Sequence, residues 1–272
     1  MFQEQLHPRS HVRATAPTQR KRRVRTDWLT LPIGALALLM LWQLVVMVGD
    51  IPAFILPAPR KVAQSFAEMI STGRLWPHVG VTLFETLAGF AIGFAVATVV
   101  GYALAKRPHA ERAVAPWLVA MQAVPIVALA PLLVSWLGVG LASKIAVSAL
   151  IVFFPILINT IIGVRSVDQE WHELLSVLHA TRWQRFRHLE LPAALPVLFG
   201  GIKLGITLAV VGAVVGEFIG ARTGLGALIN IARGGFYDTA LLFVALITLA
   251  LMALALYSAV VLLERLLVRW RR

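Results

Sequence analysis

Cysteine is absent from this chain of 272 residues, which excludes disulfides, thiol catalysis and cysteine-based metal sites. The sequence also lacks the H-E-x-x-H and G-x-S-x-G motifs, and it contains no Gly-Lys dipeptide and hence no phosphate-binding P-loop. The spacings of its seven histidines match no common metal site. We therefore expect no enzyme, no bound cofactor and no ATP hydrolysis by the chain itself.

Acidic residues are scarce, whereas apolar residues dominate. Hydrophobic residues make up 59% of the chain, and the mean hydropathy is +0.81. Apolar runs of roughly 20 residues recur, which is the length that crosses the hydrocarbon core of a bilayer. The sequence predicts an all-α integral membrane protein with six transmembrane helices over residues 28–48, 79–105, 114–137, 144–164, 194–216 and 239–268.

The basic residues are unevenly distributed between the predicted loops. Alternate loops and both ends carry eighteen Lys and Arg, and the opposite set carries six. The positive-inside rule then places both termini and the loop 165–193 in the cytoplasm (N-in/C-in). The net charge of +12 thus marks the inner face of a membrane, with no nucleic-acid partner expected. We expect the inner membrane of a bacterium, with multiple passes through the lipid bilayer.

The chain divides into three predicted parts. Residues 1–27 are polar and basic and are expected to be a disordered cytoplasmic tail. Residues 28–268 form the six-span domain, and 269–272 are a basic cytoplasmic end. The first span is too long for a signal peptide and has no A-x-A site, so we interpret it as an uncleaved anchor. A short amphipathic helix is expected at 61–70.

A polar segment with two amphipathic helical patterns, residues 165–190, interrupts two spans. Trp171, Leu174, Leu175 and Leu178 follow i, i+3, i+4 and i+7, so one helical face is bulky and apolar. Basic and aromatic residues alternate after it. Such a segment indicates docking of a partner; an amphipathic helix pair lying on anionic lipid is the alternative.

Four polar residues within the spans are candidates for a solute path. Glu85, Asn159, Lys203 and Glu217 would each be costly in lipid and should face the bundle interior or a wet cavity. The alternative is structural: hydrogen bonds between helices for Glu85, Asn159 and Glu217, and snorkelling of Lys203 to the interface.

Two spans carry small residues at every fourth position, which predicts closely packed helices in lipid. The second has Gly89, Gly93, Ala97 and Gly101, and the fifth has Gly201, Gly205, Ala209 and Ala213. Prolines 125, 131 and 155 lie within the third and fourth spans, where proline kinks helices.

The polar segment resembles the EAA signature of ABC-importer permeases: Glu-Ala-Ala, three residues, Gly, nine residues, Ile, one residue, Leu-Pro. Glu173 takes the first position, and Leu191-Pro192 the last two. Leu174-Leu175 replace Ala-Ala, His179 stands at the Gly position, and Leu189 replaces Ile. His179 puts a turn with positive φ in doubt, because glycine adopts it at lower cost.

Motifs elsewhere, such as Leu56-Pro57-Ala58-Pro59 and Trp136-Leu137-Gly138, are similar to permeases of the nitrate, sulfonate, taurine and thiamine-precursor importers. Gly212 to Phe218 and Glu85 resemble the branch for thiamine-precursor pyrimidines or riboflavin. The resemblance implies a dimer with a second permease subunit, expected to be identical. It also implies two cytoplasmic ATPase subunits that use ATP, and an extracytoplasmic substrate-binding protein.

On this resemblance, the loop 165–193 holds the helices that couple the permease to the ATPase. The implied coupling residues are Glu173, Leu174, Leu175, Leu178, His179, Ala180, Thr181, Arg182, Trp183, Leu191 and Pro192. A secondary transporter or channel driven by an ion gradient is the alternative function, although no internal repeat is evident and buried carboxylates are few. A structural membrane scaffold is a third.

Overall fold

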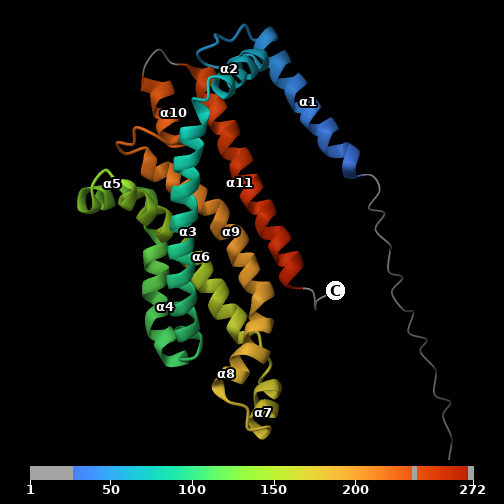
Figure 1. Cartoon of the computed structure of the whole chain (residues 1–272), viewed down its shortest axis with the longest axis vertical. Helices are drawn as coiled ribbons and strands as arrows, with labels where there is room; N and C mark the ends of the chain where they lie inside the picture. Colours follow the sequence, from blue (N-terminus) through green and yellow to red (C-terminus); the bar gives the residue numbers. More distant parts are fainter. Residues whose placement is uncertain (1–26, 235–237, 269–272) are drawn as a thin grey trace, which may run out of the picture.

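The computed structural model describes residues 27–234 and 238–268, and these form helices joined by short turns (Figure 1). The predicted tail 1–27 lies outside the described residues except for Asp27, as does the basic end 269–272. The helices are α1 (Asp27–Val48), α2 (Pro59–Ser71), α3 (Leu75–Ala105), α4 (Pro108–Ala123), α5 (Ile126–Leu137), α6 (Leu141–Arg165), α7 (Gln169–Val177), α8 (Arg182–Arg185), the π-helical turn η1 (Phe186–Glu190), α9 (Leu191–Glu217), α10 (Leu225–Gly234) and α11 (Thr239–Leu267).

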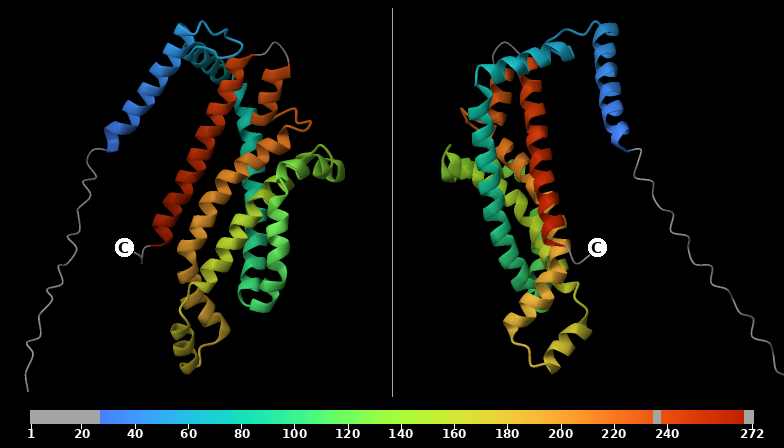
Figure 2. Two further views of the ribbon diagram at one scale, coloured as in Figure 1. Left: turned by 180° about the vertical axis from the view of Figure 1, so that it is seen from behind. Right: turned by 45° about the vertical axis from the view of Figure 1, so that its right-hand side comes forward.

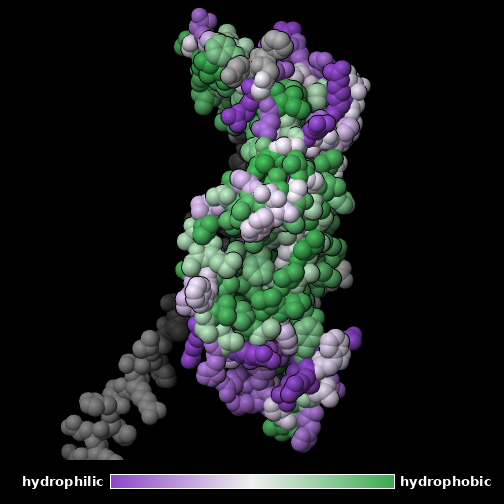
Figure 3. Space-filling view, turned by 90° about the vertical axis from the view of Figure 1, so that its left-hand side faces the viewer, coloured by the Kyte–Doolittle hydropathy of each residue, from purple (hydrophilic) through white to green (hydrophobic). Residues whose placement is uncertain are grey.

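Four helical stretches are long and apolar enough to cross a membrane: α3, α6, Arg182–Glu217 and α11. The pair α4 and α5 makes a fifth candidate if the two count as one broken span. The apolar part of α1, Ile33–Val48, falls short of this length criterion. Figure 3 shows an apolar belt between two hydrophilic ends on the face in view. An all-helical membrane protein is therefore confirmed, with four or five spans supported out of the six predicted.

The predicted third span, 114–137, is a pair of helices with a break at its centre rather than one straight helix. Helix α4 ends at Ala123, α5 begins at Ile126, and the two helices are bent by 90°. Pro125 is the residue before α5; its ring removes the amide hydrogen that a continuous helix needs there. Pro131 and Pro155 remain inside α5 and α6 without ending them.

The core is built around α6, which packs against both α3 and α9. Glycines permit this contact: an added Cβ at Gly89 would clash with Ser148 Cβ, and one at Gly212 would lie 2.6 Å from Ser148 Cα. The predicted small residues of both spans are buried at this contact. Close packing of these helices is therefore confirmed, and α3, α6 and α9 form the central unit.

Helices α2 and α10 lie at the end of the bundle opposite to α7 and α8 (Figures 1 and 2). The predicted short helix at 61–70 is present as α2, with Val62 buried against the core. Helix α1 leans away from the central unit in Figure 2, and it reaches α11 through stacking of Trp42 on Phe243.

Candidate functional site

The segment between α6 and α9 projects from one end of the bundle (Figures 1 and 2). It contains α7 and α8, so both amphipathic helices predicted there are confirmed. We call residues 165–193 the coupling loop. Its second half is continuous with a membrane-length helix, because Arg182–Glu217 runs through η1 into α9. The loop therefore has a direct helical connection to α9.

The apolar residues of α7 face outward. Trp171 is 55% exposed, Leu174 48% and Leu178 65%, while Leu175 is half-buried. Glu173 is exposed on the polar side of α7, away from this face, and accepts a hydrogen bond from Gln169 Nε2 at 3.1 Å. No residue of α7 is buried. Exposed bulky apolar groups on a projecting helix mark a surface for contact with a protein or a membrane.

The turn after α7 has the geometry of a Schellman motif. The His179 N–H donates to Ser176 O at 3.0 Å, and the Ala180 N–H donates to Leu175 O at 2.9 Å. His179 has φ +52°, the left-handed conformation that favours glycine. The turn expected at the glycine position of the signature is therefore present, with histidine in it.

Thr181 starts the next helix with a capping box. Its hydroxyl accepts from the Gln184 N–H at 3.3 Å, and Gln184 Oε1 accepts from the Thr181 N–H at 2.8 Å. Arg182 and Trp183 follow, both exposed. The Trp183 ring stacks on Phe186, and Phe186 meets the Tyr102 ring edge-on at 5.4 Å. Aromatic contacts thus join α8 to α3.

Two ion pairs fix the two ends of the coupling loop. Glu190 is buried, pairs with Lys106 and accepts a hydrogen bond from Tyr102 at 3.0 Å. At the other end, Arg165 pairs with Glu111. Lys106 and Glu111 flank the turn between α3 and α4, so both ends of the loop are attached to that turn. Sequence reasoning missed these pairs. The available signal was Glu190, a carboxylate directly before Leu191-Pro192 at the start of an apolar span.

The last two residues of the signature begin α9. Leu191 is exposed and Pro192 is half-buried in the first turn of α9. The π-helical turn ends at Glu190, two residues before this proline. Because proline has no amide hydrogen, it interrupts the regular hydrogen-bond ladder and allows a wider turn at this position.

Glu85 and Glu217 come together at the opposite end of the central unit, and both are fully buried. Glu217 Oε1 accepts from Thr82 Oγ1 at 2.6 Å, and its Oε2 accepts from the Gly226 N–H. Lys144 Nζ lies 3.7 Å from Glu85 Oε1, and Glu217 is the second charged neighbour of Glu85. The cluster joins α3, α6, α9 and α10.

Sequence reasoning missed Lys144 as a partner of Glu85, because Lys144 is the first residue of the predicted span 144–164 and was counted with the basic residues of the loop before it. Lys144 is buried within α6. Gly224, with φ +128°, completes the cluster, because an added Cβ would clash with the Glu217 carboxylate. Only glycine fits both the conformation and the space.

The other two candidates lie apart from this cluster. Lys203 forms an ion pair with Glu264, near the end of α11, at 2.5 Å. Asn159 Nδ2 donates to Pro155 O within its own helix, so this bond does not join two helices. An added Cβ at Gly201 would lie 2.7 Å from Asn159 Cβ, which places Asn159 at the α6–α9 contact.

Known proteins resemble this chain over most of its length. The riboflavin transport system permease protein RibX of Chloroflexus aurantiacus is 52% identical, with 90% of this chain and 92% of that protein covered. The putative aliphatic sulfonates transport permease protein SsuC of Bacillus subtilis is 33% identical, with 95% and 93% covered. The formylaminopyrimidine transport permease protein ThiX of Halalkalibacterium halodurans is also 33% identical, with 87% and 94% covered.

A solved structure of the MetNI methionine ABC transporter in inward-facing conformations has a TM-score of 0.56 at 20% identity, covering 70% of this chain and 93% of that one. This likeness concerns the fold alone. Residues 89–272 match the family model described as binding-protein-dependent transport system inner membrane component. The chain therefore belongs to this family of ABC-transporter permeases.

Proposed function

We propose that this chain is the permease of an ATP-driven riboflavin importer. The observation that carries the proposal is the 52% identity to a riboflavin permease over nearly the whole of both chains. Relatives named for sulfonates and formylaminopyrimidine are 33% identical. Those two solute classes are therefore the competitors against which riboflavin is tested.

The chain works as one of two identical permease subunits in a bacterial inner membrane. Six spans with both termini inside place the coupling loop in the cytoplasm, as the eighteen-to-six distribution of basic residues supports. Helix α1 and the broken pair α4–α5 supply the spans beyond the four long ones. An extracytoplasmic binding protein delivers the solute at the end that carries α2 and α10.

The α7 helix of each permease subunit docks in a groove on one of the two ATPase subunits. Support comes from its exposed apolar face, which Trp171, Leu174 and Leu178 form. Aromatic and aliphatic anchors of this kind carry most of the binding energy at protein interfaces. The exposed Glu173, on the polar side of the same helix, adds a charged contact.

Closure of the ATPases moves the coupling loop, and the two ion pairs at its ends carry this movement to the turn between α3 and α4. The pair of Glu190 with Lys106 acts on α3, and that of Arg165 with Glu111 acts on α4. Because α3, α6 and α9 are packed through glycines, they move as one body. Two such bodies rock against each other and open the path alternately to each side.

The test is uptake into proteoliposomes that contain the permease, its ATPase and its binding protein. ATP-dependent accumulation of riboflavin, with little uptake of taurine, alkanesulfonates or formylaminopyrimidine, is the expected result. Accumulation of one of those competitors in place of riboflavin would overturn the substrate. Uptake driven by an ion gradient without ATP would instead make the protein a secondary transporter.

A further inference from the structure

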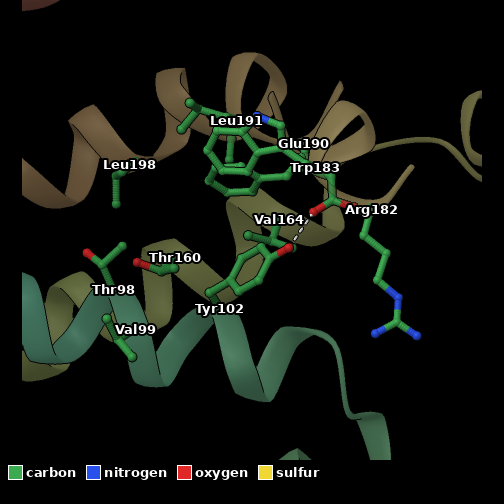
Figure 4. Close-up of a pocket in the computed structure, with 12 residues that line it drawn as sticks. Thr98, Val99, Tyr102, Thr160, Val164, Arg182, Trp183, Glu190, Leu191 and Leu198 are labelled. Atoms are coloured by element: carbon green, nitrogen blue, oxygen red, sulfur yellow. Dashed lines mark hydrogen bonds between the residues drawn. The ribbon is translucent and has the colours of Figure 1, made fainter. Parts of the chain in front are cut away.

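A cavity of about 520 Å³ opens beside the coupling loop, between α3, α6 and the start of α9 (Figure 4). Its walls are aliphatic at one end, with Val99 and Leu198, and aromatic at the other, with Tyr102 and Trp183. Its size lies within the range of roughly 300–1,000 Å³ that is usual for small-molecule sites. The cavity suits an apolar group.

A second cavity of about 420 Å³ adjoins the first and shares Tyr102, Arg182 and Glu190 with it. It adds Lys106, His172 and Arg185. The two cavities therefore form one amphipathic site. In Figure 4, the guanidinium of Arg182 lies at the end away from Thr98, Val99 and Leu198.

The charges of the second cavity do not cancel. Glu190 is the sole carboxylate among its lining residues, and its charge is matched by Lys106. The Arg182 guanidinium forms no hydrogen bond or ion pair with any described residue, and the Arg185 guanidinium donates only from Nε, to Ala180 O at 3.2 Å. Two guanidinium groups remain to bind an anion, and guanidinium suits phosphate oxygens.

We propose that this site binds an anionic phospholipid of the cytoplasmic leaflet, with an acyl chain in the first cavity and the phosphate at Arg182 and Arg185. Basic pockets between membrane helices at the cytoplasmic side bind acidic headgroups in this way. Tyr102, which lines both cavities, and Trp183 have the amphipathic rings that favour the membrane interface. A hydrophilic solute would leave its polar groups unpaired in the first cavity.

The bound lipid contacts both α3 and α8, and the pair of Glu190 with Lys106 joins the end of α3 to η1, which follows α8 directly. It would therefore act as a second brace between the coupling loop and the central unit. The assignment depends on the proposed cytoplasmic position of the loop, but not on the transported solute. Lipid binding is measured without riboflavin, so its failure is distinguishable from failure of the substrate proposal.

The experiment is native mass spectrometry of the complete transporter, permease with its ATPase, titrated in detergent with phosphatidylglycerol or phosphatidylcholine. We expect selective binding of phosphatidylglycerol. Arg185→Gln should weaken it about fivefold, because one cation near the phosphate is lost. Val99→Trp should abolish it by filling the cavity. Arg187→Gln, which changes an exposed neighbour outside both cavities, and Ile92→Trp, about two turns away on α3, should bind as wild type.

Several outcomes would overturn the site. Equal binding of phosphatidylglycerol and phosphatidylcholine would show that the arginines do not select an anionic headgroup. Equal effects of Arg185→Gln and Arg187→Gln would show a general charge effect. Displacement by glycerol 3-phosphate would show that the apolar cavity is unused, and displacement by riboflavin would make it part of the solute path. A disulfide between two Val99→Cys permeases would make the second copy its occupant. Arg185→Gln keeps the test decisive if Val99→Trp fails to assemble.

Discussion

Glu190, the residue before the Leu-Pro end of the coupling loop, is ion-paired with Lys106 at the end of α3. Glu190 is buried and also accepts a hydrogen bond from the Tyr102 hydroxyl. The pair is formed between residues 84 positions apart, and it connects the part of the chain proposed to meet the ATPase with the helix that begins the central unit.

Glu190→Gln should uncouple transport from ATP hydrolysis. The substitution leaves Lys106 without its partner, which we expect to cost about 1–3 kcal/mol of loop attachment. Solute taken up per ATP hydrolysed should fall several-fold, while the ATPase still co-purifies. Arg187→Gln is the matched control with an unchanged ratio, and a normal ratio in Glu190→Gln would refute the role of the pair.

Glu173→Arg should assemble in the membrane but lose its ATPase. The substitution reverses an exposed charge on the polar side of α7, and charges of the wrong sign disfavour docking. Co-purification of the ATPase should drop at least tenfold. Glu68→Arg, the same charge reversal at an exposed position of α2 at the opposite end of the bundle, should co-purify normally. A wild-type yield for Glu173→Arg would count against a contact of Glu173 with the ATPase.

His179→Gly should be tolerated, and His179→Val should not. The left-handed conformation at φ +52° costs an L-residue about 1–2 kcal/mol, and a β-branched residue pays most. We expect the ATPase to bind the His179→Val transporter about tenfold more weakly than the His179→Gly transporter. His172→Val, at an ordinary helical position of α7, should have little effect. If the ATPase bound both transporters with equal affinity, docking would not depend on the left-handed turn at position 179.

Gly89→Ala should destabilise the permease by about 1–3 kcal/mol, because the new methyl group would meet Ser148. Gly80→Ala is the matched control on the same helix, where an added Cβ meets nothing within 4 Å. It should leave stability unchanged or raise it by up to about 1 kcal/mol. Thermal unfolding in detergent measures both, and equal melting temperatures would contradict the packing described.

Glu85→Gln should alter uptake more than assembly if Glu85 lines the path. If it only joins helices, the loss should be one of stability, since Lys144 is then left buried without its partner. Adding Lys144→Met should restore stability in that case. Glu68→Gln, at an exposed position of α2, controls for the loss of a carboxylate. If Glu85→Gln changed neither stability nor uptake, Glu85 would neither line the path nor join helices.

Hydropathy and periodicity were sufficient to predict the helices that α3, α6, α9 and α11 form, and the two helices of the coupling loop. These patterns are local in sequence. The sequence did not show that the helix breaks at Pro125 and not at Pro131 or Pro155, because the effect of a proline depends on the packing around it. The pairs of Glu190 with Lys106 and Lys203 with Glu264 join distant segments, and a single sequence carries no information on which helices meet.

The absence of cysteine allows the central claim to be tested with one introduced thiol. Val177→Cys places it at the most exposed large apolar residue of α7, beside the proposed docking face. The thiol should be protected from membrane-impermeant reagents added outside intact cells, and a photo-reactive group attached to it should cross-link to an ATP-hydrolysing subunit. Labelling from the outside, or no capture of such a subunit in an active transporter, would contradict the account.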